Sequence, residues 1–358
     1  DFMFEELGFE SLSASRASLF FAIGLGILFG IFSERLKFCF RRALIGEDRR
    51  QAAGIWAMAV LIAVLGTQYF VAIDVISFDD HRFMNNFSLA QAVLGGLAFG
   101  AGMVLTRGCV GRLTVLASTG NLRAVTALLI FVITAHAALK GAFAPVRTTL
   151  SSVGPTFDAV SLASVIGSEA SLLAIAAVSG VIIWKRGVTL IRLLGAALIG
   201  ALVVIGWVGT GFVLFDDFDP IAFESIAFTS PWTDSIFWTL AATAVEAKFG
   251  VGLVAGVVSG AFLSAALSRR LSWQSFDGPS HFGRVTLGAG LMGIGGVLAG
   301  GCTIGAGLSG FSSLSIFPII SLFSIAIGAL VTHRMVDAKK TGLAYVQTGS
   351  KIHPQPAE

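Results

Sequence analysis

Long runs of apolar residues, separated by short polar or basic segments, dominate the pattern along this chain of 358 residues. A helix that crosses a membrane needs about 20 predominantly apolar residues, and runs of this length are too long for strands. The pattern therefore predicts a helical membrane protein with about eight or nine full spans and some broken elements. The apolar runs lie at residues 17–33, 52–73, 89–106, 124–139, 170–184, 193–215, 235–247, 249–268, 285–300 and 314–332.

Two of these runs end in the dipeptide Gly-Cys, and the segments before the cysteines match each other. Cys109 and Cys302 are 302 − 109 = 193 positions apart, and residues 94–109 align with 287–302 at that offset. Matched, glycine-interrupted segments in two halves of a membrane protein indicate a translocation site. Eight residues recur identically in this internal repeat, namely Leu94, Gly95, Gly100, Gly102, Val104, Leu105, Gly108 and Cys109.

Glycines crowd the sequence directly beside both cysteines, where each lowers helix propensity by about 1 kcal/mol. We therefore expect the helices to end there, and broken backbone at membrane depth is tolerated only where it is buried in protein or lines a cavity. A second glycine match pairs Gly26 with Gly256 and Gly30 with Gly260, at an offset of 230. Helix packing and common descent explain this match equally well.

The predicted fold class is all-α: a polytopic membrane protein with two pseudo-symmetric, inverted repeats whose broken or re-entrant helices meet near mid-membrane. A single transport domain is expected over residues 1–340. Within it, repeat one covers about 18–145, connecting spans about 160–215 and repeat two about 235–335. Residues 341–358 are expected to be a disordered tail or a vector remnant.

Composition excludes a soluble globular domain, because 55% of the residues are hydrophobic, 13% are charged and the mean hydropathy is +0.85. The lipid bilayer is thus a partner, and no nucleic-acid partner is predicted. Lysines and arginines cluster in loops that the positive-inside rule makes candidates for the cytoplasmic side, with the acidic loop at Asp79 outside. Inverted halves would place some matched loops on opposite sides of the membrane, so the topology stays open. The clusters are residues 35–50, Lys185 with Arg186 and Arg192, Arg269 with Arg270, and residues 334–340.

The chain has three cysteines that form no CxxC motif, so neither a metal site nor a cofactor is predicted. A thiol in apolar surroundings is normally neutral and can donate a weak hydrogen bond. Neutral thiols spaced along a path suit a soft, sulfur-containing anion that is passed between them. The candidate substrate-binding residues are Cys39, Cys109, Cys302, Gly108, Gly111, Gly301, Gly305, Arg107 and Arg112.

Arg107 and Arg112 flank Cys109, whereas the matching positions beside Cys302 are Gly300 and Gly305. Charge at membrane depth usually marks a pathway, so one mouth is expected to be electropositive and the other neutral. The alternative is that each arginine reaches the membrane surface or pairs with an acidic group.

At these motifs the chain resembles the YeeE/YedE family of bacterial sulfur-transport membrane proteins. The resemblance covers residues 18–335 and rests on Arg107-Gly-Cys109, on Gly301-Cys302-Thr-Ile-Gly305 and on the stretch that ends in Cys39. It implies an hourglass-shaped inner-membrane permease, not an enzyme, that imports thiosulfate. The family pattern further implies that Cys109 and Cys302 are the central thiols, that Cys39 is the cytoplasmic thiol, and that a TusA-like sulfur carrier is a cytoplasmic partner.

The first loop departs from the Cys-x-x-Gly pattern of the second, because its glycine is Gly111 and Arg112 stands where the second loop has Gly305. Other sulfur or selenium species therefore stay open as cargo. A membrane sulfur-transfer protein that forms a cysteine persulfide is a second class of function, although neither Gly-Cys motif carries a histidine. A scaffold whose glycines serve packing alone is a third.

Overall fold

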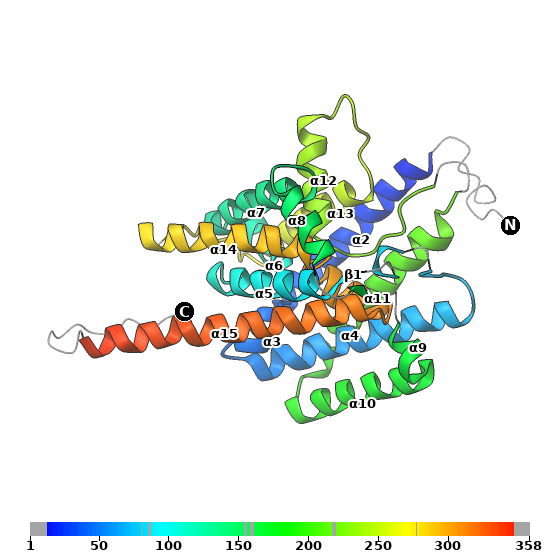
Figure 1. The fold of residues 1–358 in the computed structure, drawn as a ribbon, viewed down its shortest axis with the longest axis horizontal. Helices are drawn as coiled ribbons and strands as arrows, with labels where there is room; N and C mark the ends of the chain where they lie inside the picture. The colour runs from blue at the N-terminus through cyan, green and yellow to red at the C-terminus, as the bar shows by residue number, and fades with distance from the viewer. Residues whose placement is uncertain are drawn as a thin grey trace.

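Helices make up almost all of the structure in the computed structural model, which describes residues 13–79, 81–84, 87–153, 156–157, 161–216, 220–276 and 278–346 (Figure 1). Within that part of the chain the strands are the two-residue β1 (Phe87–Ser88) and β2 (Thr156–Phe157), which pair antiparallel. The helices up to the first Gly-Cys break are α2 (Ala14–Leu36), α3 (Phe40–Ile45), α4 (Arg49–Ala72), η1 (Arg82–Met84) and α5 (Leu89–Leu105).

The later helices continue the same layout of long apolar spans joined by short connections. They are α6 (Val110–Ser118), α7 (Leu122–Lys140), α8 (Ala144–Ser152), α9 (Leu162–Ile166), α10 (Ser168–Arg186), α11 (Leu190–Val208), the π-helix η2 (Gly209–Val213), α12 (Thr229–Leu240), α13 (Phe249–Leu267), α14 (Pro279–Leu298), the π-helix η3 (Gly305–Gly310) and α15 (Ile316–Val346).

Eight helical stretches in the described part of the chain are long and apolar enough to cross a membrane, which confirms the predicted all-α, multi-pass fold. The apolar runs at 235–247 and 285–300 are not among them. The first falls on α12, which ends at Leu240 with turns after it, and the second falls on α14. The eight stretches are Ala14–Ile45, Arg49–Ala72, Leu89–Ser118, Leu122–Lys140, Ser168–Arg186, Leu190–Val213, Phe249–Leu267 and Ile316–Val336.

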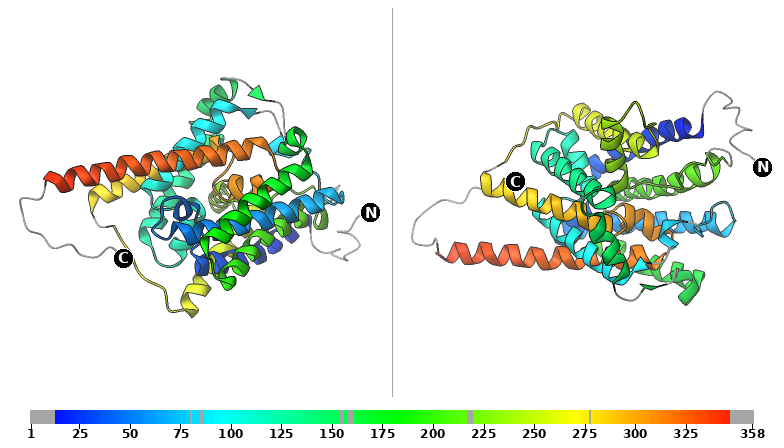
Figure 2. Two further views of the ribbon diagram at one scale, coloured as in Figure 1. Left: turned by 90° about the horizontal axis from the view of Figure 1, so that it is seen from below. Right: turned by 45° about the horizontal axis from the view of Figure 1, so that its top comes forward.

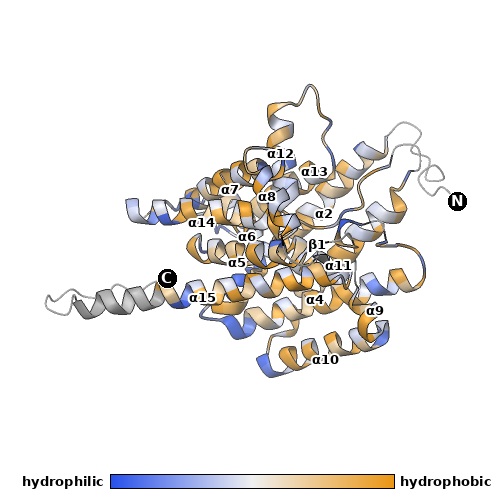
Figure 3. Ribbon diagram, viewed as in Figure 1, coloured by the Kyte–Doolittle hydropathy of each residue, from blue (hydrophilic) through white to orange (hydrophobic). Residues whose placement is uncertain are grey.

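Many large apolar side chains are exposed, as expected for a surface in lipid, and Trp184, Ile191 and Leu240 are more than four-fifths exposed. Figure 3 shows hydrophobic residues along most of the helices. Such a surface would be an aggregation hazard in water but is the normal exterior of a membrane protein. Figure 2 shows α15 extending beyond the other helices at its C-terminal end. The helix reaches Val346, and the rest of the predicted tail lies outside the described residues.

The helices of the core approach closely where glycines meet backbone atoms of a neighbouring helix. A Cβ atom on Gly26 would lie 2.5 Å from the Leu253 carbonyl oxygen, and one on Gly260 would lie 2.3 Å from the Ile27 carbonyl oxygen. Residue numbers in α2 and α13 thus increase in the same direction, and the two helices run parallel. The glycine match at an offset of 230 therefore joins two helices that pack on each other.

The helices that carry the Gly-Cys repeat run in opposite directions. Gly95 in α5 lies against Ala299, and Gly102 in the same helix lies against Gly288 of α14. Inverted repeats are related by a two-fold axis in the membrane plane, which reverses the direction of every spanning helix. Such an axis can relate the antiparallel helices α5 and α14, but it cannot relate the parallel helices α2 and α13. The inverted repeat itself stays a prediction, and α5 with α14 is the pair it must contain.

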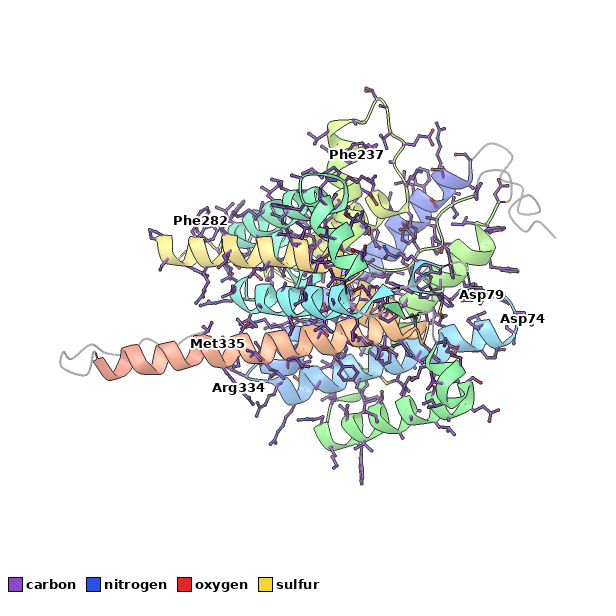
Figure 4. The ribbon with its side chains drawn as sticks, viewed as in Figure 1. Asp74, Asp79, Phe237, Phe282, Arg334 and Met335 are labelled. Carbon is purple, nitrogen blue, oxygen red and sulfur yellow. The ribbon has the colours of Figure 1, made fainter. Side chains whose placement is uncertain are left out.

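The basic clusters all lie on one face of the bundle, here called the basic face. α3 links the end of α2 to the start of α4, and Gly195 near the start of α11 contacts Leu36 at the same end. Leu122, at the start of α7, donates its amide proton to the Gln274 carbonyl in the link that follows Arg269 and Arg270. Figure 4 labels Arg334 at one end of the molecule and Asp74 and Asp79 at the other, on what we call the opposite face.

Candidate functional site

Both helices of the Gly-Cys repeat break at equivalent residues. α5 ends at Leu105 and α14 at Leu298, which are 193 positions apart. The residue two places further on is left-handed in each case, with φ of 61° at Arg107 and 72° at Gly300. Closing hydrogen bonds also match, since Arg107 donates to the Val104 carbonyl and Gly300 to the Val297 carbonyl, both at 3.2 Å. The breaks are therefore built in the same way, although an arginine occupies the left-handed position in one and a glycine in the other.

Each cysteine stands directly before a helical segment: Cys39 before α3, Cys109 before α6, and Cys302 just before η3. All three thiols are free, and their exposed fractions are 8%, 1% and 0%, so none lies on the surface. The Gly305 amide donates to the Cys302 sulfur at 3.3 Å. The amides of Arg42 and Arg112, also three residues further on, face the sulfurs of Cys39 and Cys109. With its sulfur facing an amide, each thiol can direct its own hydrogen elsewhere.

The structure brings the three cysteines to one place, although Cys39 lies far from the repeat in sequence. The side chain of Cys109 contacts that of Cys39 on one side and that of Thr303 on the other. Thr303 directly follows Cys302 and is fully buried, and its hydroxyl has no hydrogen bond of normal geometry. A buried hydroxyl without such a bond is uncommon and usually marks a site where something else binds.

The segments that follow the two breaks meet in a tight contact. A Cβ atom on Gly111 would lie 2.5 Å from the Cδ1 atom of Ile304 and 3.2 Å from the ring of Phe228. A Cβ atom on Gly305 would lie 3.1 Å from Ala227 and 3.8 Å from the Cys302 sulfur. Gly111 therefore lets the two loops approach, and Gly305 lets the second loop approach the segment before α12.

Aromatic rings close the molecule around the cysteines. Phe38 stacks on Trp56 with ring centroids 4.7 Å apart, and Phe40 lies 5.0 Å from the same indole. Phe29 contacts both Phe38 and Phe228, at 6.4 Å and 5.6 Å. All five side chains are buried, so the cysteines lie in a dry constriction rather than in an open channel.

A cavity of about 440 Å³ opens from the opposite face and reaches the second break, and we call it the outer cavity. Gly305 and Ser309 of η3 form part of its wall, so it ends beside the element that carries Cys302. Arg82 is exposed at the wall of this cavity, with its guanidinium 5.1 Å from the centre of the Phe83 ring. The wall also includes His81, Trp207, Phe223, Glu224, Ser225 and Ser230.

A second cavity, of about 240 Å³, lies at the basic face, and we call it the inner cavity. Three cations and one carboxylate line it, namely Lys37, Arg112, Arg270 and Glu34. Glu34 accepts hydrogen bonds from the Ser264 hydroxyl at 2.9 Å and from Arg270 at 3.1 Å. Since one of the three cations is paired in this way, the cavity keeps a positive balance that favours an anion.

The cavities lie at opposite ends of α2. Lys37, which follows the last residue of α2, lines the inner cavity. Near the other end of α2, the Phe21 ring packs against Gly209. Gly211, two residues further on, lines the outer cavity. The buried thiols lie between these ends, with Cys302 beside the outer cavity and Cys39 and Cys109 near Arg112 of the inner cavity.

The two candidate arginines lie in different surroundings. Arg112 lines the inner cavity and interacts with both Cys39 and Cys109. Arg107 is exposed, lines neither of the two cavities and faces Arg284. Gly108 and Gly301 directly precede their cysteines, and φ of Gly301 is 159°.

Several residues of this region carry no motif, so reasoning from the sequence missed them. Arg82 and Glu224 lie in connecting segments, and the only sequence signal was a charged residue next to an apolar run. Thr303 is part of the second loop, but its counterpart in the first loop is Val110, so the repeat gave no reason to select it. Among the described residues, no group of three histidine, cysteine or acidic side chains could hold a metal ion.

Comparisons with known proteins agree with a membrane site of this kind. The family described as sulphur transport matches residues 36–331. The thiosulfate transporter TsuA of Spirochaeta thermophila is 26% identical over 316 residues, which cover 82% of this chain and 91% of that protein. The thiosulfate transporter TsuA of Escherichia coli is 26% identical over 322 residues, covering 79% of this chain and 84% of that protein.

Proposed function

This chain belongs to the sulphur transport family, and from that premise we propose that it is an inner-membrane permease that imports thiosulfate. Two relatives that align over most of their length are named thiosulfate transporters, which supports thiosulfate as the cargo. The observation that carries the proposal is the series of three buried, free thiols between an outer and an inner cavity.

In this mechanism the anion moves from the outer cavity to Cys302, then to Cys109 and Thr303, then to Cys39 and the inner cavity. Arg82 attracts the anion at the outside, and Lys37, Arg112 and Arg270 attract it at the inside. Each thiol donates its hydrogen to the anion while its own sulfur faces a backbone amide. Thiols are weak donors, so the anion is held at each step loosely enough to leave.

The charges of the two faces assign each cavity to one side of the membrane. The positive-inside rule assigns the basic face to the cytoplasm, so the outer cavity opens to the periplasm and the inner cavity to the cytoplasm. A TusA-like sulfur carrier is the expected acceptor of the cargo at the basic face.

Growth of cells that lack other sulfate and thiosulfate importers tests the cargo. Such cells should grow on thiosulfate when they express this chain, and labelled uptake should be competed by unlabelled thiosulfate far better than by sulfate. Growth that fails despite normal expression, or uptake that sulfite or selenite competes better, would replace thiosulfate with another substrate. Ser259→Ala changes an exposed residue of α13, so this variant should support growth like the wild-type chain.

A further inference from the structure

The outer cavity contains a single carboxylate, although its proposed cargo is an anion. Of the residues that line it, His81, Arg82 and Glu224 are the ionisable ones. An ionised carboxylate at this position would repel an anion that approaches Cys302 past Ser309 and Gly305. The role of Glu224 is therefore not explained by the relay of thiols.

Glu224 is held firmly in the wall of the cavity by its backbone. The Thr210 hydroxyl donates to the Glu224 carbonyl at 2.6 Å and accepts from the Glu224 amide at 3.1 Å. Ser225 donates from its hydroxyl to the Val203 carbonyl at 2.7 Å. Ser309, which belongs to the π-helix after Cys302, donates to the Ile226 carbonyl at 2.6 Å. The segment that carries the carboxylate is thus tied directly to the element that carries the thiol.

The charges around Glu224 do not form an ion pair with it. The ion pairs within the described ranges are Arg35 with Glu34, Arg270 with Glu34 and Arg42 with Asp48. Arg82 of η1 and Lys248 before α13 act on the carboxylate from a distance, and Asp234 of α12 opposes them. Burial outweighs these charges and raises the pKa of Glu224 to about 7, so the group is poised to exchange a proton near neutral pH.

The histidine of the same cavity is not the group that titrates. Burial and the charge of Arg82 lower the pKa of His81 to about 3, so its ring is neutral at physiological pH. Its Nδ1 atom accepts a hydrogen bond from the Phe83 amide at 3.2 Å, and the Phe223 backbone is a further partner of the ring. The ring also packs against Phe78, Phe83, Trp207 and Phe223, which fixes it as part of the wall.

We propose that Glu224 takes up a proton from the external solution when an anion enters the outer cavity, so that anion binding and uptake are proton-linked. The proton joins a carboxylate oxygen, no other bond forms or breaks, and the resulting carboxylic acid donates a hydrogen bond to the anion. Protonation thereby replaces a negative charge in the wall of the outer cavity with a hydrogen-bond donor. This inference rests on the proposed transport of a sulfur anion and adds a proton to its first step.

The sign of the pH dependence follows from linkage. An anion that binds near Glu224 favours the protonated carboxyl, so binding is strongest below about pH 7 and weakens as the pH rises and the carboxyl ionises. If only the protonated form binds, the dissociation constant rises about tenfold per pH unit above that value.

Calorimetric titration of the purified full chain with thiosulfate, in buffers of different ionisation enthalpy between about pH 6 and pH 8, measures the protons taken up on binding. The wild-type chain should take up about half a proton at pH 7 and nearly a whole proton at pH 8, and Glu224→Gln should lose both the proton uptake and the pH dependence of affinity. Asp74→Asn, which removes an exposed acid outside the cavity, should behave like the wild-type chain.

Infrared difference spectra of the wild-type chain with and without thiosulfate give a second readout that needs no folded variant, because a protonated carboxyl band should appear on binding. Binding without proton uptake, or proton uptake that persists in Glu224→Gln, would overturn the inference and leave the transport proposal intact. If the wild-type chain bound no thiosulfate at all, the proposed function would be contradicted together with this inference.

Discussion

Each of the three cysteines precedes a helical segment and has the amide of the residue three places further on facing its sulfur. At Cys302 the sulfur accepts a hydrogen bond from this amide, which leaves the thiol hydrogen for a ligand. The side-chain neighbours differ. The Cys109 side chain contacts those of Cys39 and Thr303, whereas Cys302 lies beside Gly305, which is part of the wall of the outer cavity. The cysteines are therefore equivalent in local geometry but not in their polar surroundings.

Thr303→Val should slow transport without loss of stability. The Thr303 hydroxyl is buried without a normal hydrogen bond, so its removal costs the folded protein little. A donor to a charged ligand contributes about 1.5–3 kcal/mol, so uptake should fall by about tenfold or more. Thr303→Ser keeps the donor and should retain uptake, and thermal unfolding in detergent should show both variants near the wild-type midpoint. Equal uptake by the valine and wild-type proteins would remove Thr303 from the path.

A pure relay leaves the cysteines chemically unchanged, whereas sulfur transfer through a persulfide would not. Mass spectrometry of the protein after active uptake of thiosulfate should therefore find no cysteine that has gained one sulfur atom. The three cysteines are buried, so a stable persulfide on any of them would have to form from within the path. Detection of such an adduct at a level that follows turnover would favour the sulfur-transfer alternative.

At the scale of elements, glycines allow helices to approach within backbone contact, and α2 offers a matched pair for a test. Gly26→Ala should destabilise the protein by about 1–3 kcal/mol, because the new methyl group would lie 2.5 Å from the Leu253 carbonyl oxygen of α13. Gly24→Ala adds the same methyl group where no atom lies within 4 Å, so its effect should stay within about 1 kcal/mol.

Thermal unfolding of the two glycine variants in the same detergent measures this difference, with size-exclusion profiles as the check on folding. An equal loss of stability in both variants would mean that the α2–α13 contact is not what the glycines serve.

The sequence predicted the helices well where the physical signal was local. Apolar length set α4, α7 and the stretch formed by α11 and η2 to within a few residues, and the loss of helix propensity at Gly-Cys located the breaks after Leu105 and Leu298. The match between α2 and α13 could not be interpreted from the sequence, because glycines that serve close packing and glycines that reflect duplication have the same spacing.

The candidate site was predicted only where it repeats. Both central cysteines and the glycines directly before them, Gly108 and Gly301, follow from the repeat. Arg82, Glu224 and Lys37 could not be found in this way, since they join the cavities only through contacts between segments distant in sequence. The convergence of Cys39 with Cys109 likewise depends on the turn after α2, where Lys37 adopts a left-handed conformation with φ of 50°.

At the scale of the whole molecule, the basic and opposite faces define the orientation in the membrane. Asp79→Cys on the opposite face should react with a membrane-impermeant maleimide in intact cells, and Arg334→Cys on the basic face should react only after the cells are opened. The three native cysteines are buried and should give little background. Labelling of Arg334→Cys in intact cells would reverse the orientation and assign the inner cavity to the external side.

The same two faces explain why the cavities differ. The inner cavity has a positive balance that favours an anion, whereas the outer cavity combines Arg82 with the titratable Glu224. Between them the buried thiols and aromatic rings keep the centre of the molecule dry. The molecule thus has two wet cavities separated by a constriction whose polar groups are mainly sulfur and backbone.

Initial rates of labelled thiosulfate uptake into proteoliposomes test the central claim most directly, with the wild-type chain compared with Cys39→Ala, Cys109→Ala and Cys302→Ala. The account predicts that each alanine variant folds and reconstitutes normally but loses at least about tenfold of the rate, because each removes one donor from a series that the anion must traverse. Wild-type rates in both Cys109→Ala and Cys302→Ala would contradict the relay.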